Sequence, residues 1–234
     1  MFTVQPVLAA EESSDEWKFG GAFYIWMPDI DIETASEDDI EISFNDIIKN
    51  LDLTLMGNIR GHKGKWGFLI DAVYLDISDD PDKSLGRLDL LTLTNIEIKA
   101  VIVSPVVTYR VIESGRLNLD ILGGVRYFYL DVAINVDPRP DAEDDGSATS
   151  GIVGVSGDVQ LSKNWYMPFH YDVGKGDTEL TYQAWAAFSY KYSSFDLSLG
   201  YRYLKIKFDE DDEFGELLNH IIVQGPMIGA RYTF

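Results

Sequence analysis

Apolar and polar side chains alternate at every second position over several long stretches of the chain. In 195–204 the aromatic and aliphatic residues Phe195, Leu197 and Leu199 are separated by polar or small ones, and 117–129 and 224–234 follow the same rule. A period of two is the repeat of a β-strand whose two faces differ chemically. The pattern predicts ten strands, near 16–28, 53–62, 65–77, 95–111, 117–135, 150–162, 165–175, 178–192, 195–208 and 220–234.

The connections between these strands are sorted by length. Minimal turns follow the second, fourth, sixth and eighth strands, at 63–64, 113–116, 163–164 and 193–194. Longer connections follow the first, third, fifth and ninth strands, and only 175–177 breaks this order. Short turns on one rim and long loops on the other are typical of transmembrane barrels. We therefore expect an all-β chain that forms a single antiparallel transmembrane β-barrel of about ten strands. Eight or twelve remain alternatives, because 30–34 could pair with 40–44 as a hairpin.

Aromatic residues mark two levels along the strands. Trp66, Trp165 and Phe195 directly follow short turns, and Tyr74, Tyr171 and Tyr203 lie six to eight residues further along. Eight residues of a tilted strand rise roughly 20 Å, which is close to the ~25 Å apolar band between the aromatic girdles of membrane barrels. This spacing favours a membrane barrel over a soluble sandwich.

The chain ends in an alternating strand whose last apolar positions include Tyr232 and Phe234. This ending resembles the C-terminal signal of bacterial outer-membrane barrels, which the barrel-assembly machinery reads. Three further segments, 43–57, 64–76 and 199–204, resemble a group of poorly characterised, porin-like outer-membrane β-barrel proteins of Gram-negative bacteria. The resemblance implies the barrel fold and an outer-membrane location. It implies no catalytic residues.

Composition narrows the possible functions. A net charge of −20 argues against nucleic acid as a partner, because phosphates would be repelled. The chain has no cysteine, so neither a disulfide nor a thiolate metal site is expected, and no cofactor motif occurs. Residues 1–10 resemble the remnant of a signal peptide, since 7–9 fit the small-residue rule before a cleavage site. We expect 11–234 to form the barrel.

The long connections are acidic. Aspartate and glutamate gather in 29–52, 76–89, 131–145 and 209–213. Such loops could bind divalent cations and bridge them to lipopolysaccharide, or could simply be solvated. The segment 43–50 has helical apolar spacing with Ser43 as a possible N-cap, and it could partly plug the barrel mouth.

If the apolar faces point outward to lipid, charged residues of both signs line the lumen. The candidate lumen residues are Asp71, Asp120, Arg126, Asp158, His170, Asp172, Arg202 and Arg231. Ten strands lie near the narrow end of the barrel range, so these charges form either a paired network or a narrow selective pore.

A histidine beside a carboxylate can also act as a general base. His170 and Asp172 share a face that we expect near the long-loop rim, and omptin proteases, which are also ten-stranded barrels, place a His–Asp pair high in the barrel. We nevertheless expect a non-enzymatic protein, with an outer-membrane surface enzyme, omptin-like or lipid-modifying, as the alternative.

Overall fold

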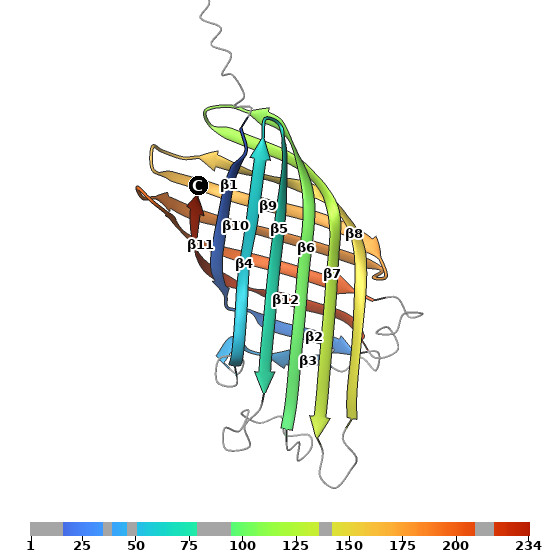
Figure 1. The fold of residues 1–234 in the computed structure, drawn as a ribbon. Coiled ribbons are helices and arrows are strands. Elements are labelled where there is room, and N and C mark those ends of the chain that lie inside the picture. Colours follow the sequence, from blue (N-terminus) through green and yellow to red (C-terminus); the bar gives the residue numbers. More distant parts are fainter. Residues whose placement is uncertain (1–15, 35–38, 46–50, 79–94, 136–141, 209–217) are drawn as a thin grey trace, which may run out of the picture.

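The computed structural model describes residues 16–34, 39–45, 51–78, 95–135, 142–208 and 218–234 (Figure 1). Their strands are β1 (Lys18–Trp26), β2 (Asp29–Thr34), β3 (Asp39–Ile42), β4 (Leu51–Lys63), β5 (Trp66–Ser78), β6 (Asn95–Glu113), β7 (Leu117–Asn135), β8 (Ala142–Gln160), β9 (Trp165–Gly176), β10 (Leu180–Lys191), β11 (Asp196–Lys207) and β12 (Leu218–Thr233). The bounds of β7 coincide with those predicted from the alternation.

Ten of these strands close into an antiparallel barrel. From β4 to β11 each strand pairs with the next strand in the chain, and β1 pairs with both β4 and β12. Closure satisfies the backbone of every strand and leaves no open edge in the ring, as a membrane requires. The predicted fold class, an antiparallel barrel of about ten strands, is confirmed. Figure 1 shows β4–β8 running across the near wall, with the last strands crossing behind them.

The hairpin formed by β2 and β3 lies outside the closed ring of ten and confirms the expected self-pairing of the first connection. Residues 227–233 of β12 pair with β1, and residues 218–224 pair with β2. Strands β1 and β2 therefore pair with successive parts of the same strand, β12, and the pairing is interrupted only at Met27 and Pro28. Met27 donates its amide to Pro226 at this interruption. Phe44 and Asn45, which follow the hairpin, are helical, and the remainder of the predicted helix lies outside the described residues.

Two local expectations are wrong. Strand β8 begins at Ala142 rather than near 150, so residues 142–149, which were expected in a connection, are paired with β7. Pro105, which cannot donate a backbone hydrogen bond and was therefore expected to mark a bulge, does not do so: the β6–β7 register is the same on both sides of it, and the shift occurs instead between Arg110 and Ile112. The carbonyl of Pro105 lies against Gly124, where an added Cβ would approach it to 2.1 Å.

The outward face is apolar, as a lipid-facing wall requires. Phe23 is 74% exposed, and Leu199 and Trp66 are each 61% exposed. Trp165 and Phe195 are exposed beside the short turns and Tyr171 further along β9, which fits the expected girdles. Along β7, Ile121, Val125 and Tyr127 are exposed, whereas Leu122, Arg126 and Phe128 on the other face are buried.

The inward face changes character along the barrel. Toward the end with the long connections it is apolar: Trp26, Phe128, Leu204, Ile206, Phe208 and Ile221 are buried together in one cluster, which we call the apolar layer. Toward the end with the short turns and the C-terminus, the inward side chains are polar. The expected polar lumen is therefore correct for only part of its length. No helix in the described part of the chain is long and apolar enough to cross a membrane.

A charge placed on the outward face tests this assignment. Leu199→Arg lies within the apolar band, and the cost to the free energy of unfolding should be about 2–4 kcal/mol. Leu161→Arg makes the same change on an exposed residue beside a short turn and should cost at most about 1 kcal/mol. Urea unfolding in lipid vesicles measures both, and equal costs would contradict a lipid belt at Leu199.

Candidate functional site

A buried ion-pair network crosses the lumen below the apolar layer. Its first half is built around Asp172 on β9, whose side chain is fully buried. Arg126 of β7 donates from Nη2 to both oxygens of Asp172 at 2.8 Å, and His170 Nε2 lies 2.7 Å from Oδ2. Arg126 also donates from Nη1 to Thr181 Oγ1 of β10 at 2.8 Å. Asp172 thus accepts from both an arginine and a histidine.

The second half is built around Arg202 on β11. Its Nη2 donates to Asp71 Oδ2 of β5 at 2.8 Å, and its Nη1 donates to the hydroxyl of Tyr24 on β1 at 2.7 Å. Tyr24 in turn donates to the other oxygen of Asp71 at 2.8 Å. The guanidinium carbon of Arg202 also lies 4.7 Å from the ring centre of Trp26, within cation–π range.

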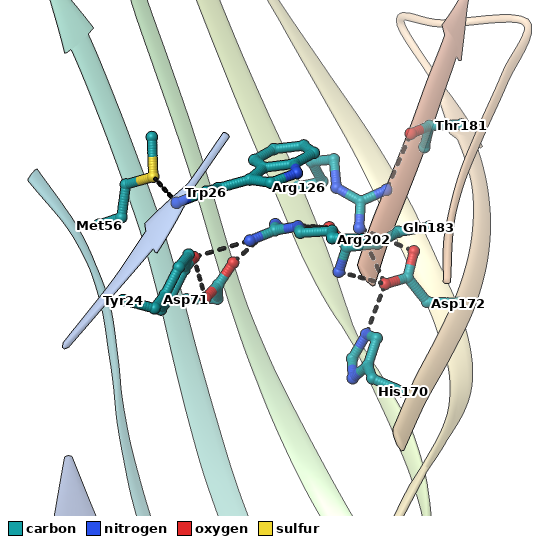
Figure 2. A network of polar contacts seen from close by, with 10 residues as sticks. All are labelled: Tyr24, Trp26, Met56, Asp71, Arg126, His170, Asp172, Thr181, Gln183 and Arg202. Atoms are coloured by element: carbon teal, nitrogen blue, oxygen red, sulfur yellow. Dashed lines mark hydrogen bonds and ion pairs between the residues drawn. The ribbon is translucent and has the colours of Figure 1, made fainter. Parts of the chain in front are cut away.

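Gln183 of β10 joins the two halves. Its Oε1 accepts from Arg202 Nε at 3.0 Å, and its amide donates to Asp172 Oδ2 at 3.5 Å. Figure 2 shows the result, a continuous chain of contacts from Tyr24 and Asp71 at one wall to Asp172 and Thr181 at the other. Buried arginine–carboxylate pairs are costly to desolvate, so each needs the full set of hydrogen bonds that this network supplies.

Between the network and the short-turn rim lies a second, looser set of polar contacts. Arg110 pairs with Asp120, Asn118 donates to Asp158, and Arg231 donates to Asp196 at 2.8 Å. These contacts surround a cavity of about 360 Å³, which we call the vestibule. Its lining reaches from Lys18, Lys65 and Thr233 at the rim to His170 and Trp185 at its floor.

All eight candidate lumen residues point into the barrel, but they form separate groups. Asp71, Arg126, His170, Asp172 and Arg202 meet in the network, whereas Asp120, Asp158 and Arg231 belong to the looser set. The network lies in the middle of the barrel, so the expectation that His170 and Asp172 lie near the long-loop rim is wrong. Both occupy the central part of β9.

Sequence reasoning missed three partners in the network, namely Tyr24, Thr181 and Gln183. The only available signal was their inward register, since Gln183 lies directly opposite Asp172 across the β9–β10 ladder. The described residues contain no group of three or more histidines, aspartates or glutamates arranged to hold a metal ion.

The C-terminal aromatic residues lie on the outside of the closure seam. Phe234 exchanges two backbone hydrogen bonds with Phe19, and its ring is 72% exposed. Tyr232 is also exposed, and its ring stacks on that of Phe234 with centres 5.9 Å apart. The terminal residue therefore completes the pairing between the first and last strands.

Comparison with solved structures identifies the fold. Similar structures include the outer membrane protease OmpT from Escherichia coli (8% identity, 94% of this chain and 97% of that chain covered, TM-score 0.55). Ail, the attachment invasion locus protein of Yersinia pestis, matches at 12% identity over 94% and 99% of the two chains, with a TM-score of 0.42. The translocator domain of the autotransporter NalP from Neisseria meningitidis matches at 10% identity over 96% and 90%, with a TM-score of 0.47.

No protein-family model and no curated protein sequence matches the chain. The likeness to OmpT shows that the chain has the fold of outer-membrane β-barrels, and at this level of identity it shows the fold alone.

Removing the shared carboxylate should destabilise the barrel strongly. Asp172→Ala leaves Arg126 buried without its counter-ion, which costs about 3–5 kcal/mol in comparable buried pairs. Asp158→Ala is the matched control, because Asp158 is only partly buried and its hydrogen bonds from Asn118 are 3.3 and 3.4 Å long. The midpoint of urea unfolding should fall far more for Asp172→Ala, and equal shifts would show that the network does not stabilise the fold.

Proposed function

We propose that this chain is an outer-membrane barrel whose lumen is closed to solutes, and that it acts as a structural barrel presenting different surfaces at its two ends. The observation that supports this proposal is the near-complete burial of inward side chains at two successive levels. Arg126 and Arg202 are each 2% exposed in the network, and Leu204 and Ile206 are 0% and 1% exposed in the apolar layer.

An open pore would wet its inward side chains at every level. The residues at these two levels have almost no contact with water, although strands of the same barrel expose polar groups in the vestibule. A ten-stranded barrel has little interior space beyond what side chains fill. The paired-network interpretation of the lumen charges is therefore favoured over the selective narrow pore.

The proposed orientation places the short turns in the periplasm and the long connections outside the cell, as in other outer-membrane barrels. In this orientation the acidic connections would face lipopolysaccharide, to which divalent cations could bridge them. The outward aromatic and aliphatic side chains would contact outer-membrane lipid. Tyr232 and Phe234, exposed on the closure seam, would be read by the barrel-assembly machinery during insertion.

We also propose that His170 and Asp172 have no enzymatic role. Asp172 accepts two hydrogen bonds from Arg126, which hold its carboxylate in the ion pair, and the dyad lies deep in the barrel. The His170 ring stacks parallel to Trp185 with centres 5.9 Å apart, and its Nδ1 is enclosed without a hydrogen-bond partner among the described residues. This arrangement is more consistent with a histidine that positions Asp172 than with a general base that contacts a substrate.

Planar-bilayer recording tests the closed lumen. The wild-type protein should give no discrete conductance steps. Two layers in series close the lumen, so Arg202→Ala and Leu204→Ala alone should each stay silent, and the double variant should conduct. Heat-modifiable migration on gels verifies that each variant is folded. Discrete steps from the wild-type protein would refute the proposal.

A separate measurement tests the role of the dyad. His170→Ala should lower the midpoint of urea unfolding, because Asp172 loses one of its donors. Neither the wild-type protein nor the variant should hydrolyse peptide or phospholipid substrates. Hydrolysis by the wild type that disappears in His170→Ala would instead support the surface-enzyme alternative.

A further inference from the structure

The vestibule is cationic although the whole chain carries a net charge of −20. Five lysine and arginine side chains line it, against three carboxylates. The five are Lys18, Arg60, Lys65, Arg110 and Arg231. A concave surface with an excess of one charge and weakly polarisable walls raises the local concentration of oppositely charged ions. The vestibule should therefore attract anions.

The carboxylates of the vestibule are already engaged. Asp120 and Glu113 both pair with Arg110, and Asp158 accepts from Asn118. Arg231 is neutralised by Asp196, which lies outside the vestibule lining. By contrast, Lys18, Arg60 and Lys65 form no hydrogen bond or ion pair between side chains with any residue that the structure describes. The positive charge of the vestibule thus resides on these three cations.

Arg60 is the most informative of the three. It points inward from β4 opposite Gly20, and its Nε is enclosed without an acceptor. Arg60 lines both the vestibule and a smaller cavity of about 70 Å³ beneath the network. A guanidinium stays charged under all ordinary conditions and carries five donors, so enclosing it without a counter-ion costs stability. A binding role would account for a buried guanidinium that forms no ion pair or side-chain hydrogen bond with the described residues.

We propose that the vestibule binds a small phosphorylated solute that enters from the short-turn rim. Arg60 holds two phosphate oxygens with its fork of donors, and Lys18 and Lys65 supply further positive charge at the rim. Arginine matches the geometry of phosphate in this way. Three unpaired cations suit the charge of a phosphate monoester better than that of a single carboxylate.

The dimensions of the vestibule favour a small solute over a polymer. Its volume of about 360 Å³ lies at the lower end of the range for small-molecule sites. Trp185 and Pro168 in its lining offer apolar surface to the organic part of the solute. This proposal goes beyond the closed barrel and does not depend on it, because the vestibule lies entirely on one side of the network.

Calorimetric titration of the full-length protein in zwitterionic detergent tests the site, with inorganic phosphate as the probe and chloride holding the ionic strength constant. Phosphate should bind to one site, and Arg60→Gln should weaken binding at least tenfold. Arg116→Gln is the matched control, because Arg116 is exposed at the same rim and does not line the vestibule. It should bind within twofold of the wild type. No binding by the wild type, or equal binding by Arg60→Gln, would overturn the proposal.

Unfolding in urea separates a binding role from a structural one. Without phosphate, Arg60→Gln should unfold at the same urea concentration as the wild type or a higher one, because it removes an unpaired charge. Phosphate should raise the midpoint of the wild type and leave that of the variant unchanged. A lower midpoint for Arg60→Gln without phosphate would mean that Arg60 supports the fold, and the proposal would fail.

Two further arms complete the test. Lys18→Gln provides a second variant that leaves Arg60 in place, and it should weaken phosphate binding several-fold; unchanged binding would count against the site. Vesicles containing phosphatidylglycerol test a lipid headgroup as the source of the phosphate. One outcome is that the vesicles stabilise the wild type but not Arg60→Gln while inorganic phosphate does not bind. That result would overturn the proposal that the ligand is a soluble phosphorylated solute. The conductance test of the closed lumen uses no Arg60 variant. Either proposal, the closed lumen or the phosphate site, can therefore be refuted without affecting the other.

Discussion

The meeting of two guanidinium groups with two carboxylates inside the barrel is the interaction on which the rest of the structure depends. Strand number and stagger set the mean diameter of the barrel, and side chains then hold particular strands together across its interior. Arg202 reaches from β11 to Asp71 on β5, and Arg126 reaches from β7 to Asp172 on β9. These contacts tie together strands that are not neighbours in the sheet and require that every partner keep its inward register.

The network also divides the interior into regions with different chemistry. On one side the apolar layer excludes water, which strengthens the ion pairs beside it but makes any unpaired charge there expensive. On the other side the vestibule admits water, and there the arginines of the ion pairs are more exposed and some cations have no protein partner among the described residues. The interior of the barrel therefore changes along its length, from a tightly packed, water-free region at the apolar layer to a hydrated, polar region at the vestibule.

The strands and their faces were predictable because alternation is a local property of the sequence. The stretches 117–129 and 195–204 show it over most of their length, and their exposed residues such as Val125 and Leu199 alternate with buried ones such as Arg126 and Arg202. The start of β8 was missed, since 142–149 contains acidic, glycine and serine residues instead of alternating apolar ones. Pairing with the long β7 extends this strand where its own sequence gives no signal.

The contents of the lumen were harder to predict, because they depend on which strands face one another across the barrel. Strand tilt and stagger decide this, and neither is encoded in a local pattern. Tyr24 and Gln183 consequently escaped notice, although both alternate correctly. The apolar layer was missed for a related reason: near the end of β11 Tyr203 on one face adjoins Leu204 and Ile206 on the other, so alternation no longer distinguishes the lipid side from the interior.

The shared use of β12 by β1 and β2 has a consequence for how the chain reaches its folded state. The first strand and the hairpin after it pair locally with β4 and within the hairpin, but each also pairs with β12, far away in the chain. Contacts between opposite ends of a chain carry a large loop-closure entropy and form late. Until then, the N-terminal strands present open edges to their surroundings, so the chain must be held by other factors in the interval. Closure of the ring is therefore expected to be cooperative, because the first and last strands stabilise each other only when both are in place.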